Sequence, residues 1–197
     1  MTRKVRIEIA FTGYWIAGTG LARGRDVDVV THRDRDDLPA LPMTQVKGQL
    51  RETAERLAAG GAGGWTADLV TDLFGPASQA EGAGGRGGAL AFRGEARLAE
   101  PARAWLAAED QKGVRAGLFR RLAATAIGDR GAAIDHSLRS VEAAVPVTLE
   151  GDVEWVGDAP PAPGWVKALD LACAATVAFG KLKADGYGRA LAQVVAA

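Results

Sequence analysis

Alternation of apolar and polar residues predicts four strands, at residues 4–11, 90–98, 145–155 and 187–195. In the first of them, Val5, Ile7, Ile9 and Phe11 alternate with charged or small residues. A period of two residues places the apolar side chains on one face, which is expected to be buried. The last of the four is the least regular.

Two further segments have apolar residues at helical spacing. The first helix is expected to follow Pro42, with Thr44 as its cap, and to end at Gly60; the second begins near Trp165 and stops at Gly180. The order strand, helix, strand, strand, helix, strand is that of the ferredoxin-like (RRM-like) βαββαβ fold. The sequence therefore predicts an α+β fold in which both helices cover one face of the sheet.

Three segments lie outside this frame: a long connection at 12–43, a glycine-rich low-complexity stretch at 75–89 and an insertion at 99–144. The glycine-rich stretch is expected to be mobile. The insertion is expected to be helical over 101–109 and 115–125. An insertion of that length between the middle strands indicates a functional arm.

Composition narrows the class of protein. The chain has 197 residues, which favours one domain, and 24 cationic residues balance 24 acidic ones. A single cysteine excludes an intramolecular disulfide and a cysteine-cluster zinc site. We expect a cytoplasmic protein without a secretory signal or a membrane span. Zero net charge argues against a generally basic surface and still permits a local basic groove.

No Cys–His pair, Ser–His–Asp pattern or nucleotide-phosphate motif stands out, which leaves three polar clusters. The first contains Asp26 and Asp28 and continues through His32 and Asp34. In an extended segment the first two carboxylates would lie on one side, about 7 Å apart. Such oxygens suit Mg²⁺ or Mn²⁺ at a phosphoryl centre. The alternative is a solvated acidic loop.

The second cluster is at the start of the first predicted helix. Lys47 and Arg51 are four residues apart and share a helix face, where a bound phosphate would be favourable. Gly48 lets another chain approach, although glycine weakens a helix by about 1 kcal/mol relative to alanine. An ordinary amphipathic helix with exposed cations is the alternative.

The third cluster follows the second predicted helix. Lys181, Lys183 and Arg189 surround Gly186 and Gly188, whose backbone amides could meet a phosphate, and Tyr187 offers a stacking face. A plain glycine-rich turn between a helix and a strand would look similar.

Taken in order, these residues resemble the repeat-associated mysterious protein (RAMP) superfamily, and most of all the backbone subunit that forms the filament of type III CRISPR effector complexes. Four motifs carry the resemblance: Asp28 and Asp34 with Leu41-Pro42 following, the segment PMTQVKGQLR at 42–51, Leu73-Phe74-Gly75, and Gly186-Tyr187-Gly188-Arg189. Residues 125–142 also resemble the arm before the third core strand of the family.

The resemblance implies a single RAMP domain over 1–197. The family's palm would comprise 1–60, 89–98 and 145–197, and its thumb about 99–144. Copies of the chain would stack along a CRISPR RNA. The RNA-contacting residues would be Lys47, Gly48, Arg51, Lys181, Lys183, Gly186, Gly188 and Arg189, with Arg130, Ile134, His136 and Arg139 at the thumb.

By the same resemblance, Asp28, with Asp26 as second choice, would cleave target RNA with a divalent cation, Mg²⁺ or Mn²⁺, held at Asp28. The partners implied are CRISPR RNA, target RNA, further copies of the chain and other effector subunits. Two related alternatives are a cleavage-inactive binding subunit and a stand-alone guide-processing ribonuclease. The alternative from a different class of protein is a ferredoxin-like domain that binds a small molecule.

Overall fold

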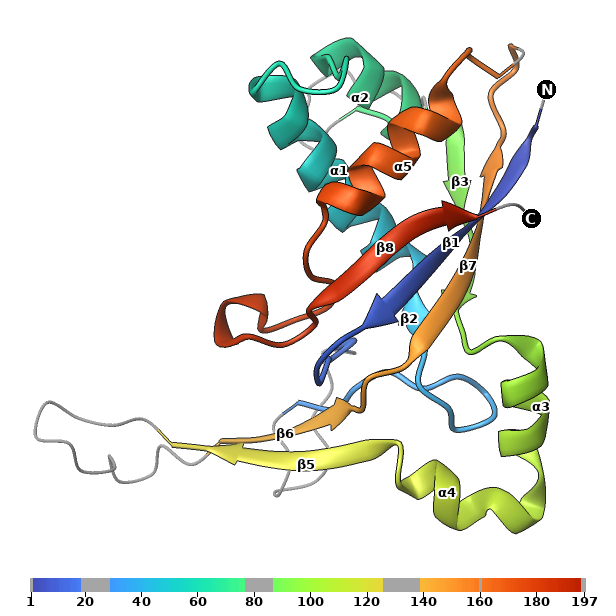
Figure 1. The fold of residues 1–197 in the computed structure, drawn as a ribbon, viewed down its shortest axis with the longest axis vertical. Coiled ribbons are helices and arrows are strands. Elements are labelled where there is room, and N and C mark those ends of the chain that lie inside the picture. The colour runs from blue at the N-terminus through green and yellow to red at the C-terminus, as the bar shows by residue number, and fades with distance from the viewer. Residues whose placement is uncertain (1, 19–28, 77–86, 126–138, 160, 196–197) are drawn as a thin grey trace, which may run out of the picture.

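The central element is a four-stranded antiparallel sheet in the order β3-β7-β1-β8 (Figure 1). The computed structural model describes residues 2–18, 29–76, 87–125, 139–159 and 161–195. The strands are β1 (Lys4–Phe11), β3 (Leu90–Phe92), β7 (Thr148–Trp155) and β8 (Ala190–Val195). The first predicted strand, 4–11, is confirmed, and two others begin three residues later than expected; the remaining one, 90–98, is broken at Gly94, where φ is +69°.

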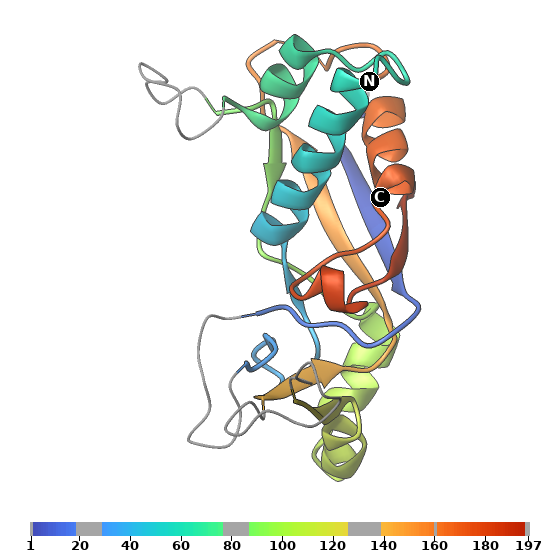
Figure 2. The same ribbon diagram turned by 90° about the vertical axis from the view of Figure 1, so that its left-hand side faces the viewer.

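Three helices cover one face of this sheet: α1 (Met43–Ala59), α2 (Ala67–Phe74) and α5 (Trp165–Ala175) (Figures 1 and 2). Strand order and helix placement confirm the predicted ferredoxin-like βαββαβ arrangement. The sequence prediction did not include α2, an eight-residue helix capped by the Thr66 hydroxyl, which accepts from the Leu69 amide at 3.1 Å.

The core lies between the sheet and these helices. In β1, Val5, Ile7, Ile9 and Phe11 are buried, and they form one cluster with the apolar faces of the three helices. The other sheet face carries the charged positions of the same strands. There Lys4 pairs with Asp152 at 2.7 Å and Arg6 with Glu150 at 3.1 Å.

Two predicted helix ends are wrong. The residue before α1 is Pro42, and no side chain caps this helix; the Met43 amide instead donates to the Gly94 carbonyl at 2.9 Å. Thr44 therefore lies inside the first turn. The last helix stops at Ala175, because Thr176 is extended and its hydroxyl donates to the Ala172 carbonyl at 2.8 Å.

The insertion lies between β3 and β7 in the chain and at one end of the molecule (Figure 1). Its elements are β4 (Glu95–Ala96), α3 (Glu100–Ala107), η1 (Glu109–Gln111), α4 (Lys112–Ala116), β5 (Phe119–Ala124) and β6 (Arg139–Ala144). The helix predicted over 101–109 agrees with α3. The one predicted over 115–125 is wrong beyond Ala116, since residues 119–124 pair with β6. Apolar residues in so short a run fit either period.

Trp15 anchors the long connection at 12–43. Its buried indole stacks on Phe11 with ring centroids 4.2 Å apart, and its Nε1 donates to the Val145 carbonyl at 2.9 Å. Its backbone exchanges two hydrogen bonds with Ala144, at 3.1 and 2.8 Å. Further along, β2 (Leu41–Pro42) pairs with β4. The connection is therefore packed against both the sheet and the insertion.

Among the described residues, no helix is long and apolar enough to cross a membrane.

Candidate nucleic-acid interface

Lys47 is a half-buried cation without an anionic partner in the described part of the chain. Burial lowers the pKa of its ammonium group, and the nearby Arg51 lowers the pKa further. The first turn of α1 contains no acidic residue and no side-chain cap, so the positive end of the helix dipole is also left uncompensated. An anion bound here would relieve both effects.

Gly48 occupies an exposed position on α1 where the protein itself does not require a glycine. A methyl group added at this residue would meet no atom within 4 Å. A glycine within a helix costs about 1 kcal/mol relative to alanine. Its presence leaves the ridge of α1 free of side chain beside Lys47, which suits close approach by another chain.

The loop at 180–189 is fastened to the opposite flank of α1. The Gln49 amide donates to the Gly180 carbonyl at 2.9 Å and accepts from the Gly180 amide at 3.1 Å. The Lys183 ammonium lies 3.4 Å from the Glu52 carboxylate. The stem of Lys181 lies directly over Gly18, because a Cβ there would fall 2.3 Å from Lys181 Cδ. Two lysines thus lie along this flank.

At 100° per residue, Gly48 lies between Lys47 on one side of α1 and the Gln45–Gln49–Glu52 stripe on the other. That stripe contacts Gly18, Gly180 and Lys183. Lys47, Gly48, Lys181 and Lys183 therefore form one surface, which we call the α1 ridge. A polyanion crossing α1 at Gly48 would meet cations on both flanks.

Two of the predicted glycines differ in what they do. Gly188 has φ +78°, and a Cβ there would lie 2.0 Å from the Phe179 carbonyl oxygen; Gly186 has φ +89° with open space around it. Gly188 is thus required by the fold of the loop. At Gly186 only the positive φ favours glycine, because the space around the residue is open.

We expect Gly188→Ala to lower the free energy of unfolding by roughly 3 kcal/mol, since strain at positive φ adds to a backbone clash. The matched variant Gly186→Ala carries the strain alone and should cost about 1 kcal/mol. Chemical denaturation of both variants measures the difference. Equal losses would show that the clash is relieved by movement of the loop.

Two other predicted RNA contacts are less available. Arg51 is already used within the fold, where it donates to Glu55 at 2.8 Å and to the Pro76 carbonyl at 2.9 Å. The β1–β8 register, continued by the hydrogen bond from the Thr12 amide to the Arg189 carbonyl, places Arg189 on the open face of the sheet. The sheet therefore separates Arg189 from Lys47.

The open face of the sheet does not have the properties of an RNA platform. Its charged positions on β1 and β7 are Lys4, Arg6, Glu8, Glu150, Asp152 and Glu154, so that carboxylates outnumber cations. The aromatic residues of these strands and of β3, Phe11, Phe92 and Trp155, are buried on the helix side. Single-stranded RNA is commonly held by exposed aromatics on such a sheet.

The predicted catalytic and metal-binding residue Asp28, its alternative Asp26, and the thumb residues Arg130, Ile134 and His136 lie outside the described residues. Their described neighbours are informative. Gly18, where the acidic loop begins, accepts a hydrogen bond from Gln45 of α1 at 3.3 Å, and Val29, where it ends, forms a bridge with Val141 of β6. Arg139 is the exposed first residue of β6. The loop therefore starts beside the α1 ridge.

Asp34, the second acidic residue of the family motif, has a structural role. Its carboxylate is buried and accepts from the amides of Asp36 and Leu38, at 2.9 and 3.0 Å. These bonds close the turn that follows the acidic loop. The Asp34 carboxylate is therefore used to hold the backbone of this turn.

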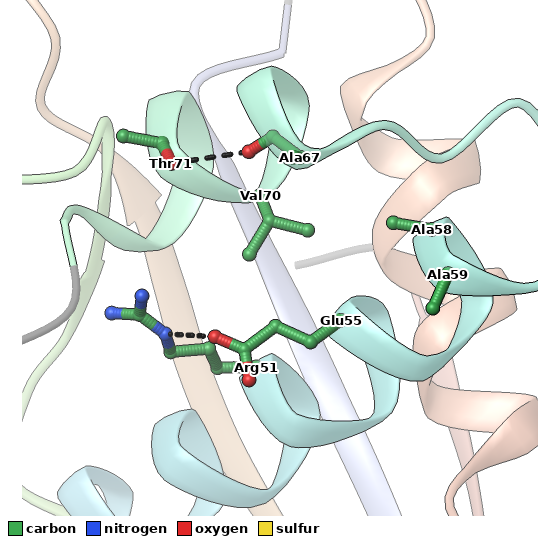
Figure 3. Close-up of a pocket in the computed structure, with 7 residues that line it drawn as sticks. All are labelled: Arg51, Glu55, Ala58, Ala59, Ala67, Val70 and Thr71. Carbon is green, nitrogen blue, oxygen red and sulfur yellow. Dashed lines mark hydrogen bonds and ion pairs between the residues drawn. The ribbon is translucent and has the colours of Figure 1, made fainter.

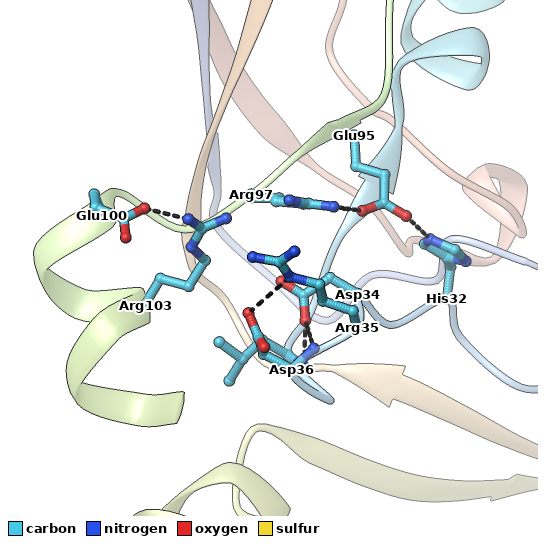
Figure 4. A network of polar contacts seen from close by, with 9 residues as sticks. His32, Asp34, Arg35, Asp36, Glu95, Arg97, Glu100 and Arg103 are labelled. Atoms are coloured by element: carbon cyan, nitrogen blue, oxygen red, sulfur yellow. Dashed lines mark hydrogen bonds and ion pairs between the residues drawn. The ribbon is translucent and has the colours of Figure 1, made fainter. Parts of the chain in front are cut away.

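A polar network that sequence reasoning missed lies next to this turn (Figure 4). His32 Nε2 is 2.5 Å from the Glu95 carboxylate, whose second oxygen accepts from Arg97 at 2.6 and 2.9 Å. Burial alone would raise the pKa of Glu95, but hydrogen bonds from His32 and Arg97 outweigh it and hold that pKa below its usual value. His32 and Glu95 are 63 residues apart in the chain, so their pairing gave no local signal.

Within the ranges that the structure covers, no group of three or more His, Cys, Asp or Glu side chains is placed to hold a metal ion.

No protein-family model matches the chain, and no curated protein matches it. Solved structures do. One is a chain of the Type III-B Cmr-beta complex bound to cognate target RNA, with a TM-score of 0.69 and 8% identity, covering 98% of this chain and 97% of that one. Another, from the apo state of Cmr-beta, has a TM-score of 0.64 and 9% identity over the same shares. The chain thus has the same fold as these chains of the Cmr-beta complex. This agrees with the ferredoxin-like fold that the resemblance implied.

Proposed function

We propose that the chain is an RNA-binding subunit of a type III CRISPR effector complex, whose copies stack along the CRISPR RNA as its backbone. The observation that carries the proposal is the α1 ridge, where a half-buried Lys47, with no ion pair among the described residues, lies beside the side-chain-free position Gly48. The likeness of the whole chain to a subunit of a complex with target RNA supports the class.

In this proposal the ridge holds the sugar–phosphate backbone. Lys47 contacts a phosphate on one flank of α1, and Lys181 and Lys183 contact the next ones on the other flank. Contacts of this kind position a nucleic acid without reading its sequence. Base pairing between guide and target supplies the sequence specificity.

We further propose that the subunit cleaves bound target RNA at Asp28, with Mg²⁺ or Mn²⁺ as the cation and the target's 2′-hydroxyl as nucleophile. The thumb residues Arg130, Ile134, His136 and Arg139 would separate base pairs at regular intervals. A single carboxylate contributes little to catalysis on its own. Most of the rate enhancement for RNA cleavage would therefore come from an in-line geometry imposed on the target strand.

Co-expression with the neighbouring genes of its operon tests the class of protein. The expected result is a large particle with an absorbance maximum near 260 nm, from which RNA of uniform length can be extracted. A monomer without nucleic acid would contradict the proposal and favour a small-molecule-binding domain. Cleavage of precursor RNA by the isolated chain would instead favour the stand-alone processing ribonuclease.

Gly48→Ala separates binding from folding. We expect the variant to gain about 0.5 to 1 kcal/mol in unfolding free energy, because alanine is the better helix former. Its affinity for single-stranded RNA should fall roughly tenfold, the equivalent of one charge-assisted contact. Thermal unfolding and filter binding measure the two effects.

Gly113→Ala is the matched control, since Gly113 is an exposed glycine of α4 with open space around it. It should leave RNA affinity unchanged. If Gly48→Ala is stabilising and binds RNA as well as the unmodified chain, RNA does not cross α1 at this residue.

A further inference from the structure

A pocket of about 360 Å³ lies between α1 and α2 (Figure 3). Ala58 and Ala59 of α1 line one side of it, and Ala67 and Val70 of α2 line the other. Pockets of roughly 300 Å³ and above, with mostly apolar walls and a few polar groups, are typical of sites for small ligands. At the lower end of that range, this pocket suits a single flat ring system.

Polar groups lie at one end of the pocket. Arg51 Nε donates to Glu55 Oε1 at 2.8 Å, and Arg51 Nη1 donates to the Pro76 carbonyl at 2.9 Å (Figure 3). These bonds hold the guanidinium and the carboxylate in place. Neither Arg51 Nη2 nor Glu55 Oε2 has a hydrogen bond to any described residue. A fixed donor and a fixed acceptor are therefore available beside the apolar walls.

A nucleobase has the shape and the edge groups that this pocket fits. Its flat ring would be buried against the apolar walls, and its edge carries hydrogen-bond donors and acceptors. Because every RNA base offers both kinds of group, the Arg51–Glu55 pair can bond to any of them. The pocket is thus suited to hold a base without selecting one.

Lys47 lies on the same flank of α1 as the pocket. Lys47, Arg51, Glu55 and Ala59 are four residues apart, which places them in one stripe along the helix. Each step along this stripe advances about 6 Å along the helix axis. Arg51 is close enough to Lys47 to lower the pKa of the Lys47 ammonium group. A strand with a phosphate on Lys47 therefore has a base within reach of the pocket.

The charges of this stripe favour a ligand that combines a ring with a phosphate. Lys47 and Arg51 are cations and Glu55 is the single anion, so the stripe is positive overall. We propose that the α1–α2 pocket takes up one unpaired base of the strand whose phosphate contacts Lys47. The strand as the source of the base rests on the proposed function, whereas the affinity of the pocket for a base does not.

Titration of the full chain with adenosine monophosphate and with ribose phosphate tests the pocket, because the two probes differ only in the base. We expect adenosine monophosphate to bind at least about tenfold more tightly. Ala59→Leu narrows the pocket, so it should abolish this difference and leave the binding of ribose phosphate unchanged. Ala104→Leu makes the same change at an exposed position of α3 and is the matched control, which should bind both probes normally. Thermal unfolding shows that each variant is folded.

Equal affinity of the unmodified chain for the two probes would overturn the proposal, as would an Ala59→Leu variant that still prefers adenosine monophosphate. The monophosphates of the other RNA bases should bind within about fivefold of the adenosine probe. Strict selection of one base would also overturn the proposal, because it would indicate a site for a particular small molecule.

Failure of this proposal can be told apart from failure of the proposed function. A chain that binds adenosine monophosphate in the pocket but is purified from the co-expression without RNA would refute the proposed function and leave the base pocket standing. A particle that contains RNA, built from a chain with no preference for the base-containing probe, would refute the pocket alone.

Discussion

Replacing Lys47 and Lys181 together by alanine should weaken binding of single-stranded guide RNA on the order of 100-fold, if each lysine contributes about 1.5 kcal/mol through a charge-assisted contact. The two residues lie on opposite flanks of α1, so the double substitution removes the proposed phosphate contacts on both sides of Gly48. Neither has an ion pair within the described residues that its removal would disrupt. The fold should therefore be retained.

Salt dependence makes the measurement specific. Each phosphate contact on a single strand contributes about 0.7 to the slope of log K against log salt, so the double variant should lose about 1.4 from that slope. Lys167→Ala, on the exposed side of α5, is the matched control and should leave both affinity and slope unchanged. An unaltered slope in the double variant would mean that RNA binds elsewhere.

The period of the apolar residues was sufficient to predict the four core strands and two of the three helices that cover them. Val5 to Phe11 alternate because one face of β1 is buried, and this information is entirely local. What the sequence did not reveal depends on partners distant in the chain. Phe119 to Ala124 form a strand because residues 139–144 pair with them, although their pattern alone was compatible with a helix.

The candidate site divides in the same way. Lys47 was predicted from helical spacing and Gly48 as a point where another chain can approach. The structure adds that Lys47 has no ion pair among the described residues and that Gly48 is not needed for packing. Arg51 was predicted from the same spacing as Lys47, and Arg189 from the glycine-rich cluster that follows the second helix. Their positions differ for reasons that spacing cannot show: Arg51 is bound to Pro76, and the β1–β8 register puts Arg189 on the other face of the sheet.

The residues of the first polar cluster also differ in their roles. Asp34 is committed to the turn amides of Asp36 and Leu38, and His32 is held by Glu95, so both act within the fold. The loop that carries Asp28 begins at Gly18, against the α1 ridge. The proposed cleavage therefore rests on Asp28 and its second choice, Asp26, which both lie outside the described residues.

Asp28→Ala in the assembled complex should reduce cleavage of target RNA by at least about 100-fold, because it removes the carboxylate that is proposed to hold the catalytic cation. Binding of guide and target should stay within about twofold, because the α1 ridge is unchanged. Gel separation of labelled target measures the cut products, and a mobility shift measures the binding.

Asp36→Ala is the matched control, since it removes one carboxylate from the same connection, where Asp36 lies 3.8 Å from Arg35. It should cut target at the unmodified rate. If Asp28→Ala cuts as fast as that control while Asp26→Ala does not, the catalytic carboxylate is Asp26. If all three variants cut normally, cleavage belongs to another subunit and this chain only binds RNA.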